Sequence, residues 1–254
     1  MHYTTKIQDL ISNIPSTPKT ASSYLKSRVE PNFFLYPIPQ NEIYTIIEGL
    51  KDNGSKVNSV ATSVLLGSRH IISPILAHLL TLFVQQGYFP DNLKLGCITP
   101  KFKNGDRDKV NNYRPICTLS PLSKIFEKVI NNRMVEFIEH NQIFSDTQFG
   151  FRKNMGTEDA LMNYTDHIQT QLKNKKFTIS IFLDLSKAFD VINHNILEIK
   201  LYHYGFRGKF LQFLMSFIKD RRYFVNVNGR NSVIKTVNNG VPQGSTLGPL
   251  LFLL

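Results

Sequence analysis

FLDLSKAFD, residues 182–190, is the stretch that decides the fold. It completes an alternating run over 177–185 in which every second side chain is bulky and apolar: Phe177, Ile179, Ile181, Leu183 and Leu185. This period of two predicts a strand that closes at Asp184, and a helix is predicted to open at Phe189 and Asp190. A carboxylate at a strand end can hold Mg²⁺ while the amides of a following helix face a triphosphate. The alternative is that Asp184 only terminates the strand or caps the helix.

A second motif, GVPQGSTLGPLLF over 240–252, predicts a rigid loop. Its first ten residues hold three glycines and two prolines, which favour tight turns and permit the close approach of another backbone. Gln243 offers hydrogen-bond donors and an acceptor beside Gly244, which removes side-chain bulk. That combination suits contact with a nucleotide or a template base. The alternative is a tight loop before a buried helix.

Basic residues dominate the charge of the chain. There are 30 Lys and Arg against 19 Asp and Glu, a formal charge of +11 over 254 residues. Such a surplus favours nucleic acid or an anionic membrane as partner, because phosphate contacts release counterions, although a basic protein without such a partner also fits. Lys101 in TPK (99–101) and Arg114 in YRPI (113–116) suit phosphate contact, with a solvated basic loop as the alternative.

A further motif, QFGFR over 148–152, sets two aromatic rings around a glycine next to an arginine. Gln148, Phe149, Gly150 and Arg152 are therefore candidates for stacking on a template and pairing with its backbone. A helix-capping turn with core aromatics explains the same residues equally well.

Cysteine and histidine patterns exclude several other classes of protein. Two cysteines form neither a disulfide framework nor a metal site, and none of the seven histidines has a second ligand at metal spacing. The sequence has no GxxxxGK[ST] loop and no nucleophile elbow. Its polar, proline-interrupted start is no secretory signal, and no apolar run reaches the ~20 residues that span a bilayer. We therefore expect an intracellular protein without a membrane partner.

Periodicity predicts a helix-rich chain after an extension over residues 1–32. Helices are predicted at 41–53, at 71–87, from Ser120 onward, and at 157–173, 187–203 and 209–219. In the helix at 157–173, the residues predicted to face inward are Leu161, Tyr164, Ile168 and Leu172. Strand and loop are predicted over 88–118, and Asn228-Gly229 predicts a hairpin between strands at 222–228 and 232–237.

In their order and spacing, these motifs resemble the reverse transcriptases of non-LTR retrotransposons, the LINE and jockey-like elements. The resemblance runs from about Phe33 to the last residue. It implies an α+β right-hand polymerase fold, helix-rich, with fingers, an incomplete palm and an antiparallel palm sheet. The implied division is an extension over 1–32, fingers-region helices and basic loops over 33–176, and palm over 177–254, with the reverse transcriptase domain at roughly 80–254.

The resemblance also implies a role for each matching residue. Asp184 is implied to be the first catalytic aspartate and a ligand of both Mg²⁺ ions, and Leu185 to add its backbone carbonyl to the metal site. Phe189 is implied to abut the sugar and exclude ribonucleotides, while the backbone around Lys187 and Ala188 meets the triphosphate. The other implied contacts are with the triphosphate (Lys101 and Arg114), with the incoming nucleotide and template (Gln243 and Gly244), and with the template (Gln148, Phe149, Gly150 and Arg152).

The implied function is that of an RNA-directed DNA polymerase. Such an enzyme transfers nucleotides from deoxynucleoside triphosphates to a primer 3′-hydroxyl on an RNA template, with two Mg²⁺ ions. The sequence ends before the aromatic-x-Asp-Asp hairpin of the family, so we expect this chain by itself to be inactive and residues 250–254 to keep a wet surface. The alternatives are a non-enzymatic, nucleic-acid-binding remnant of a mobile element and a reverse-transcriptase-like maturase.

Overall fold

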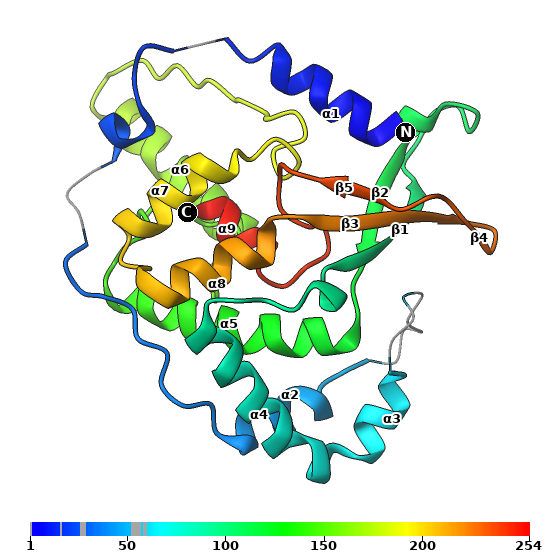
Figure 1. Ribbon diagram of the computed structural model, residues 1–254. Helices are drawn as coiled ribbons and strands as arrows, with labels where there is room; N and C mark the ends of the chain where they lie inside the picture. The colour runs from blue at the N-terminus through cyan, green and yellow to red at the C-terminus, as the bar shows by residue number, and fades with distance from the viewer. Residues whose placement is uncertain (1, 16, 26–28, 52–56, 58–59) are drawn as a thin grey trace.

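The computed structural model describes residues 2–15, 17–25, 29–51, 57 and 60–254, in which one mixed sheet lies at one side of a mostly helical body (Figure 1). The helices are α1 (His2–Ser12), α2 (Gln40–Glu48), α3 (Thr62–Gly67), α4 (Arg69–Gln86), α5 (Pro121–His140), α6 (Thr157–Lys173), α7 (His194–His203), α8 (Gly208–Ile218) and α9 (Gly248–Leu253). The predicted α+β class is confirmed. Residues 1, 16 and 26–28 of the predicted extension, and 52–53 of the helix predicted over 41–53, lie outside the described residues.

The sheet as a whole is mixed, while its three strands within the predicted palm range pair antiparallel, as expected. Its strands are β1 (Leu95–Phe102), β2 (Tyr113–Thr118), β3 (Arg221–Val227), β4 (Arg230–Asn231) and β5 (Lys235–Val237). β1 pairs antiparallel with β2 but parallel with β3, and β3 pairs antiparallel with both β4 and β5. A parallel pair needs a long crossover, and the chain between β1 and β3 supplies one because it contains α5 to α8.

Several turn and cap predictions are confirmed. Asn228 and Gly229 both take positive φ, 49° and 79°, and form the predicted turn after β3, although the strand predicted over 232–237 is present only as β5 and β4 precedes it. The Ser120 hydroxyl caps α5 by accepting a hydrogen bond from the Ser123 amide at 3.1 Å. α4 ends at Gly87, whose φ of 72° is left-handed. In each case the chemistry of one or two neighbouring residues is enough to fix the backbone.

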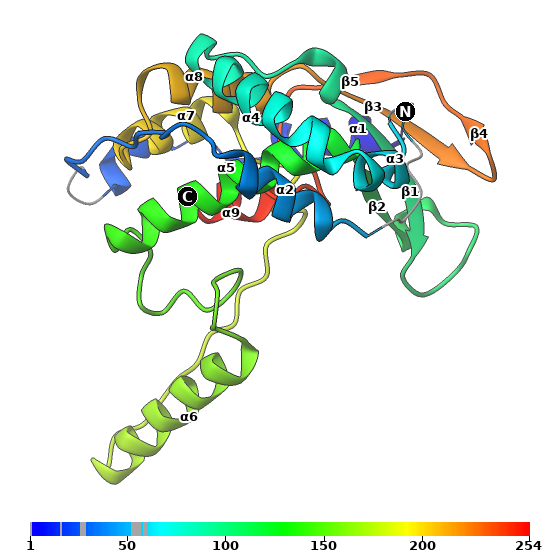
Figure 2. The same cartoon turned by 90° about the horizontal axis from the view of Figure 1, so that it is seen from below.

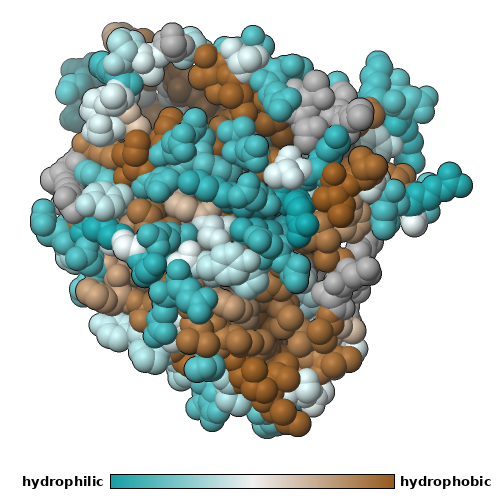
Figure 3. Space-filling view, viewed as in Figure 1, coloured by the Kyte–Doolittle hydropathy of each residue, from teal (hydrophilic) through white to brown (hydrophobic). Residues whose placement is uncertain are grey.

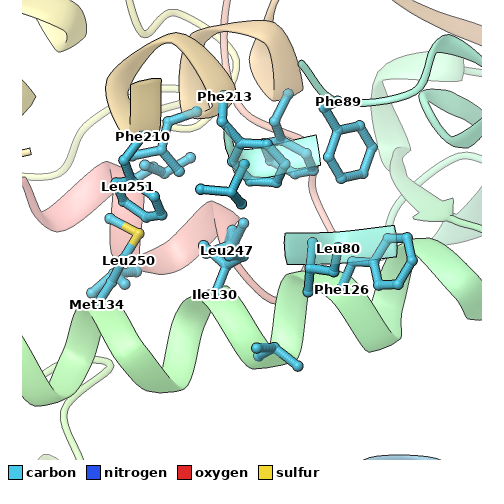
Figure 4. Packing of buried hydrophobic residues seen from close by; sticks show 14 of the residues in the cluster. Leu80, Phe89, Phe126, Ile130, Met134, Phe210, Phe213, Leu247, Leu250 and Leu251 are labelled. Atoms are coloured by element: carbon cyan, nitrogen blue, oxygen red, sulfur yellow. The ribbon is translucent and has the colours of Figure 1, made fainter. Parts of the chain in front are cut away.

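One apolar core joins helices from both halves of the chain. α5 runs through it, and Figure 4 shows Ile130 of α5 facing Leu247 and Leu250, with Leu80 of α4 and Phe213 of α8 close by. All five side chains are at most 4% exposed. Burial of this extent stabilises the fold through the apolar area removed from water. The 240–252 motif is therefore anchored in the main core.

Residues 157–185 form an arm that projects from the body (Figure 2). The predicted helix is present as α6, but none of its 17 described residues is buried, so the predicted inward face is wrong. The strand predicted over 177–185 is also wrong, because these residues are exposed and belong to no strand. Alternation produces a strand only when a neighbouring backbone pairs with it, and no described segment pairs with this one.

The helix predicted over 187–203 begins later, as α7 at His194. Residues 186–190 instead form a turn in which Lys187 has a φ of 51°. Asn193 sets the start of α7, because its side-chain oxygen accepts hydrogen bonds from the amides of Asn195 and Ile196 at 2.9 and 3.2 Å. A turn thus stands where a helix start was expected.

Apolar residues at the C-terminus are more buried than expected. Leu250, Leu251 and Leu254 are at most 4% exposed, and only Phe252 and Leu253 keep part of their surface wet. Exposed apolar side chains also gather over α3 and α4, at the bottom of Figure 3, where the exposed ones are Val64, Ile71 and Ile75. No helix in the described part of the chain has the length and apolar character to cross a bilayer.

Leu161→Ala, in the arm, is expected to change the free energy of unfolding by less than about 0.5 kcal/mol, because a mostly exposed side chain has little burial to lose. Leu80→Ala is the matched control, since Leu80 is fully buried and its truncation leaves a cavity. Urea denaturation of both variants beside the parent chain measures the difference. An equal loss in the free energy of unfolding for Leu161→Ala and Leu80→Ala would show that the arm packs against the body in solution.

Candidate functional site

Backbone hydrogen bonds join the turn at 186–192 to the loop at 240–248, and we refer to this contact as the junction. The Val241 amide donates to the Phe189 carbonyl and the Gly240 amide to the Ile192 carbonyl, both at 2.8 Å. His194 completes the junction, with its Nε2 2.8 Å from the Gly240 carbonyl oxygen. Burial lowers the pKa of His194, which favours the neutral ring that donates this bond.

Side chains connect the same two motifs. Gln243 Nε2 donates a hydrogen bond to Asp190 Oδ1 at 2.7 Å. Burial raises the pKa of Asp190, while the hydrogen bond from Gln243 and the charge of Lys187 oppose that rise. Asp190 was predicted only as part of a helix start, and its partner lies 53 residues away along the chain.

The loop lies so close to other backbone that two of its glycines are required. Gly244 has a φ of 103°, and a Cβ there would stand 2.5 Å from the Cys117 carbonyl oxygen. The Cys117 amide in turn donates to the Gln243 carbonyl at 3.0 Å, which holds the loop against the end of β2. Gly240 has a φ of 77°, and its Cβ would stand 2.7 Å from the Phe189 carbonyl oxygen. The predicted close approach of backbone is confirmed at both positions.

A buried carboxylate from α5 anchors the far end of the loop. Glu127 Oε2 accepts the Thr246 amide at 2.8 Å, and Oε1 accepts the Ser123 hydroxyl at 2.9 Å. Glu127 is 0% exposed, and burial raises its pKa although the Arg221 cation lowers it. Sequence reasoning missed this residue. The available signal was a glutamate on the apolar face of a predicted helix, directly after Phe126.

A cavity of about 120 Å³ lies between the sheet and the junction. Most of its wall is apolar, and Lys187, Asp190 and Gln243 contribute polar groups from the two motifs. Cys117 also lines it, and burial raises the pKa of this thiol to about 12, which keeps it protonated and unreactive. Ile7 of α1 lines the same cavity, so the N-terminal helix lies beside the junction. The two most informative motifs therefore meet at one small, partly open cavity.

Lys101 and Arg114 lie side by side, but on the other face of the sheet. They are directly paired in the β1–β2 register, and both are exposed. Directly paired residues share a face, and successive residues of a strand alternate between faces. Pro100 and Pro115 are also directly paired, and Pro115 lines the cavity. The pleat therefore places Lys101 and Arg114 away from Lys187 and Gln243, as a separate basic pair.

Aromatic contacts fix Phe189 in the turn. Its ring stacks on Phe252 of α9 with centroids 4.8 Å apart, and meets the edge of Phe151 at 6.0 Å. Lys187, Ala188 and Phe189 are all half-buried. The predicted sugar and triphosphate contacts of these residues stay predictions, and the structure adds that all three stand at the junction.

The QFGFR motif makes local contacts. Arg152 donates two hydrogen bonds to the Glu139 carboxylate, at 3.0 and 2.7 Å, and Gln148 Nε2 donates to the Gly150 carbonyl at 3.0 Å. Phe149 is half-buried. The Arg152 contact ties the turn to the end of α5, and the template role of the four residues stays a prediction.

Asp184 and Leu185 are exposed at the end of the arm that leads into the turn at 186–192, and they are not part of the junction. Among the described residues, no group of three or more His, Cys, Asp or Glu side chains could hold a metal ion. Mg²⁺ is reluctant to dehydrate and needs several oxygen ligands at near-ideal geometry. The described residues therefore do not fit a two-ion centre, and the metal-binding roles of Asp184 and Leu185 stay predictions.

Comparison with known proteins gives one consistent result. Residues 100–254 match the family model described as reverse transcriptase (RNA-dependent DNA polymerase). The chain is 33% identical over 223 residues to the probable RNA-directed DNA polymerase from transposon BS of Drosophila melanogaster, covering 85% of this chain and 24% of that protein. It is 31% identical over 238 residues to the RNA-directed DNA polymerase from mobile element jockey of the same species, covering 92% and 26%. It thus spans about a quarter of the length of these relatives.

Proposed function

Because the chain belongs to the reverse transcriptase family, in its non-LTR, jockey-like group, we propose that it contributes to RNA-directed DNA synthesis for a mobile element. The relatives named for that activity are longer, so the proposal concerns the part of the reaction that these residues serve. The observation that carries it is the junction, which brings Lys187, Asp190 and Gln243 from two motifs to one cavity.

The junction suits the binding of a deoxynucleoside triphosphate. Lys187 supplies a cation for phosphate, and the Gln243 amide supplies hydrogen bonds for a base or sugar. Phe189 is packed between two other rings, so it forms a firm wall that we propose excludes ribonucleotides. Sites held rigid in this way lose less entropy when a ligand binds. The glycines at 240 and 244 let the loop reach its neighbours without a Cβ in the way.

Nucleic acid is the second ligand. The family acts on nucleic acid templates with nucleotide substrates, and we propose an RNA template and a DNA primer here. Lys101 and Arg114 form a basic pair on the exposed face of the sheet, which suits phosphates of a strand lying across β1 and β2. The net charge of +11 supports the same assignment.

Reverse transcriptases use divalent metal ions, and Mg²⁺ is the ion that we propose. Asp184 and the Leu185 carbonyl are the candidate ligands by resemblance.

Salt dependence of binding to an RNA–DNA duplex tests the nucleic-acid function. The affinity of the 254-residue chain is expected to fall linearly on a log–log plot against salt, and Lys101→Ala or Arg114→Ala to reduce the slope by about one each. Lys128→Ala, an exposed lysine on α5, is the matched control and is expected to leave the slope unchanged. Undetectable or salt-independent binding would contradict the proposal.

A non-enzymatic nucleic-acid-binding protein is the second candidate, favoured by the exposed position of Asp184. Primer extension on an RNA template with Mg²⁺ separates the two. Extension that Asp184→Ala abolishes supports catalysis by this chain. Duplex binding without extension supports the binding function alone.

A further inference from the structure

The contact between Asp190 and Gln243 has a chemical direction. An ionised carboxylate only accepts hydrogen bonds, so Gln243 must turn Nε2 toward Asp190 Oδ1, 2.7 Å away. The carbonyl Oε1 of the same amide then points away from Asp190, and no described group donates a hydrogen bond to it. Both side chains line the cavity beside the sheet.

We propose that Asp190 is a positioning residue, which fixes the Gln243 amide so that its carbonyl oxygen faces the cavity as a hydrogen-bond acceptor. The inference rests on the proposed binding of a nucleotide at this cavity. The nucleotide group that meets Gln243 must then be a donor, an N–H of the base or an O–H of the sugar. Phosphate oxygens accept hydrogen bonds, so the phosphates are expected to lie elsewhere, toward Lys187.

The loop backbone does not need Asp190 to hold its place. The amides of Val241 and Gly240 already bond to the turn, and the Gln243 carbonyl accepts from the Cys117 amide. Loss of the carboxylate should therefore release the Gln243 amide while the loop stays docked. A purely structural role for Asp190 predicts the reverse, a displaced loop with general loss of stability.

Side-chain amide NMR of Gln243 in the ¹⁵N-labelled 254-residue chain tests the contact without any ligand. In the parent chain, the amide protons are expected to shift with pH as Asp190 ionises, above the usual aspartate range. The other ionisable groups on the cavity wall are Cys117, Lys187, Tyr223 and Lys235. Asp190→Asn keeps a hydrogen-bond acceptor, so the Gln243 amide protons should stay shifted but should no longer respond to pH. Asp190→Leu removes the acceptor and should abolish the shift itself.

Asp146→Leu, at an exposed aspartate, is the matched control and should leave the Gln243 amide signals unchanged. Amide signals in Asp190→Leu that equal those of the parent chain would overturn the inference. If Asp190→Leu does not fold, Gln243→Met decides the question. The pKa of Asp190 must rise in that variant, because the hydrogen bond from Gln243 lowers it, and an unchanged pKa would overturn the inference.

Affinity for dATP then tests the consequence for the ligand. Asp190→Leu and Gln243→Met are each expected to weaken binding about tenfold, and the double variant no further, because both remove the same acceptor from its place. Asp190→Asn should retain most of the affinity of the parent chain for dATP, because it keeps an acceptor for Gln243. Unchanged binding in Asp190→Leu would overturn the positioning role. Failure of the parent chain to bind dATP would instead refute the proposed nucleotide site, and the amide spectra would still decide the role of Asp190.

Discussion

Glu127→Ala is expected to lower the free energy of unfolding by about 3–5 kcal/mol, the usual cost of removing one partner from a buried charged network. The substitution leaves the Thr246 amide and the Ser123 hydroxyl without their buried acceptor. It also leaves Arg221, which is 2% exposed, without the opposing charge of Glu127. Arg221 would keep its hydrogen bonds to the Tyr223 hydroxyl and the Phe217 carbonyl, but its Nη2 has no hydrogen-bond partner among the described residues.

Urea denaturation measures this effect, and Glu136→Ala is its matched control. Glu136 lies exposed on the same helix, so its loss is expected to change stability by less than about 0.5 kcal/mol. Glu127→Gln should fall between the two, because it keeps the shape but turns one acceptor into a donor. A cost at Glu127 no greater than that at Glu136 would show that the carboxylate does not anchor the loop.

Gly244→Ala is expected to lower the free energy of unfolding by about 2–5 kcal/mol, because it adds backbone strain at positive φ and overpacking. The added Cβ would lie 2.5 Å from the Cys117 carbonyl oxygen. That oxygen belongs to the backbone of β2 and cannot swing aside as a flexible side chain could. Either the loop or the strand must move, and Gln243 moves with it.

Gly208→Ala separates the cost of backbone strain at positive φ from the cost of the steric clash. Gly208 has a φ of 60°, but no atom lies within 4 Å of the point where its Cβ would stand, so only the backbone cost of about 1–2 kcal/mol is expected. Thermal denaturation of both variants gives the difference, which is the cost of the close contact. Equal costs would mean that the loop does not approach β2 as described.

Elements that depend on neighbouring residues were predictable from the sequence. The Asn228-Gly229 turn, the Ser120 cap and the Gly87 helix end each follow from the conformational preference of one or two residues. The 240–248 loop belongs to the same class, since its glycines and prolines indicated a rigid backbone that approaches another. The residues that determine each of these features lie within a few positions of it in the sequence.

Features that depend on distant residues could not be predicted in the same way. The alternation over 177–185 is typical of a strand, but a strand forms only if a second segment pairs with it. The local sequence does not identify such a segment. Glu127 gains its function from Thr246, 119 residues away. The opposed faces of Lys101 and Gln243 follow from the pleat and pairing of β1 and β2, which no local pattern determines.

The parallel pairing of β1 with β3 has a consequence for how the protein is made. Leu95 pairs with Arg222, so the two strands cannot meet until the ribosome has released the long segment between them. Closing so large a loop costs chain entropy before any contact offsets it, and such pairing slows folding. During synthesis, β1 and β2 can therefore pair only with each other, and the edge of β1 that later pairs with β3 stays unpaired. Such an unpaired edge can pair with another chain, so it exposes the nascent protein to aggregation until β3 is made.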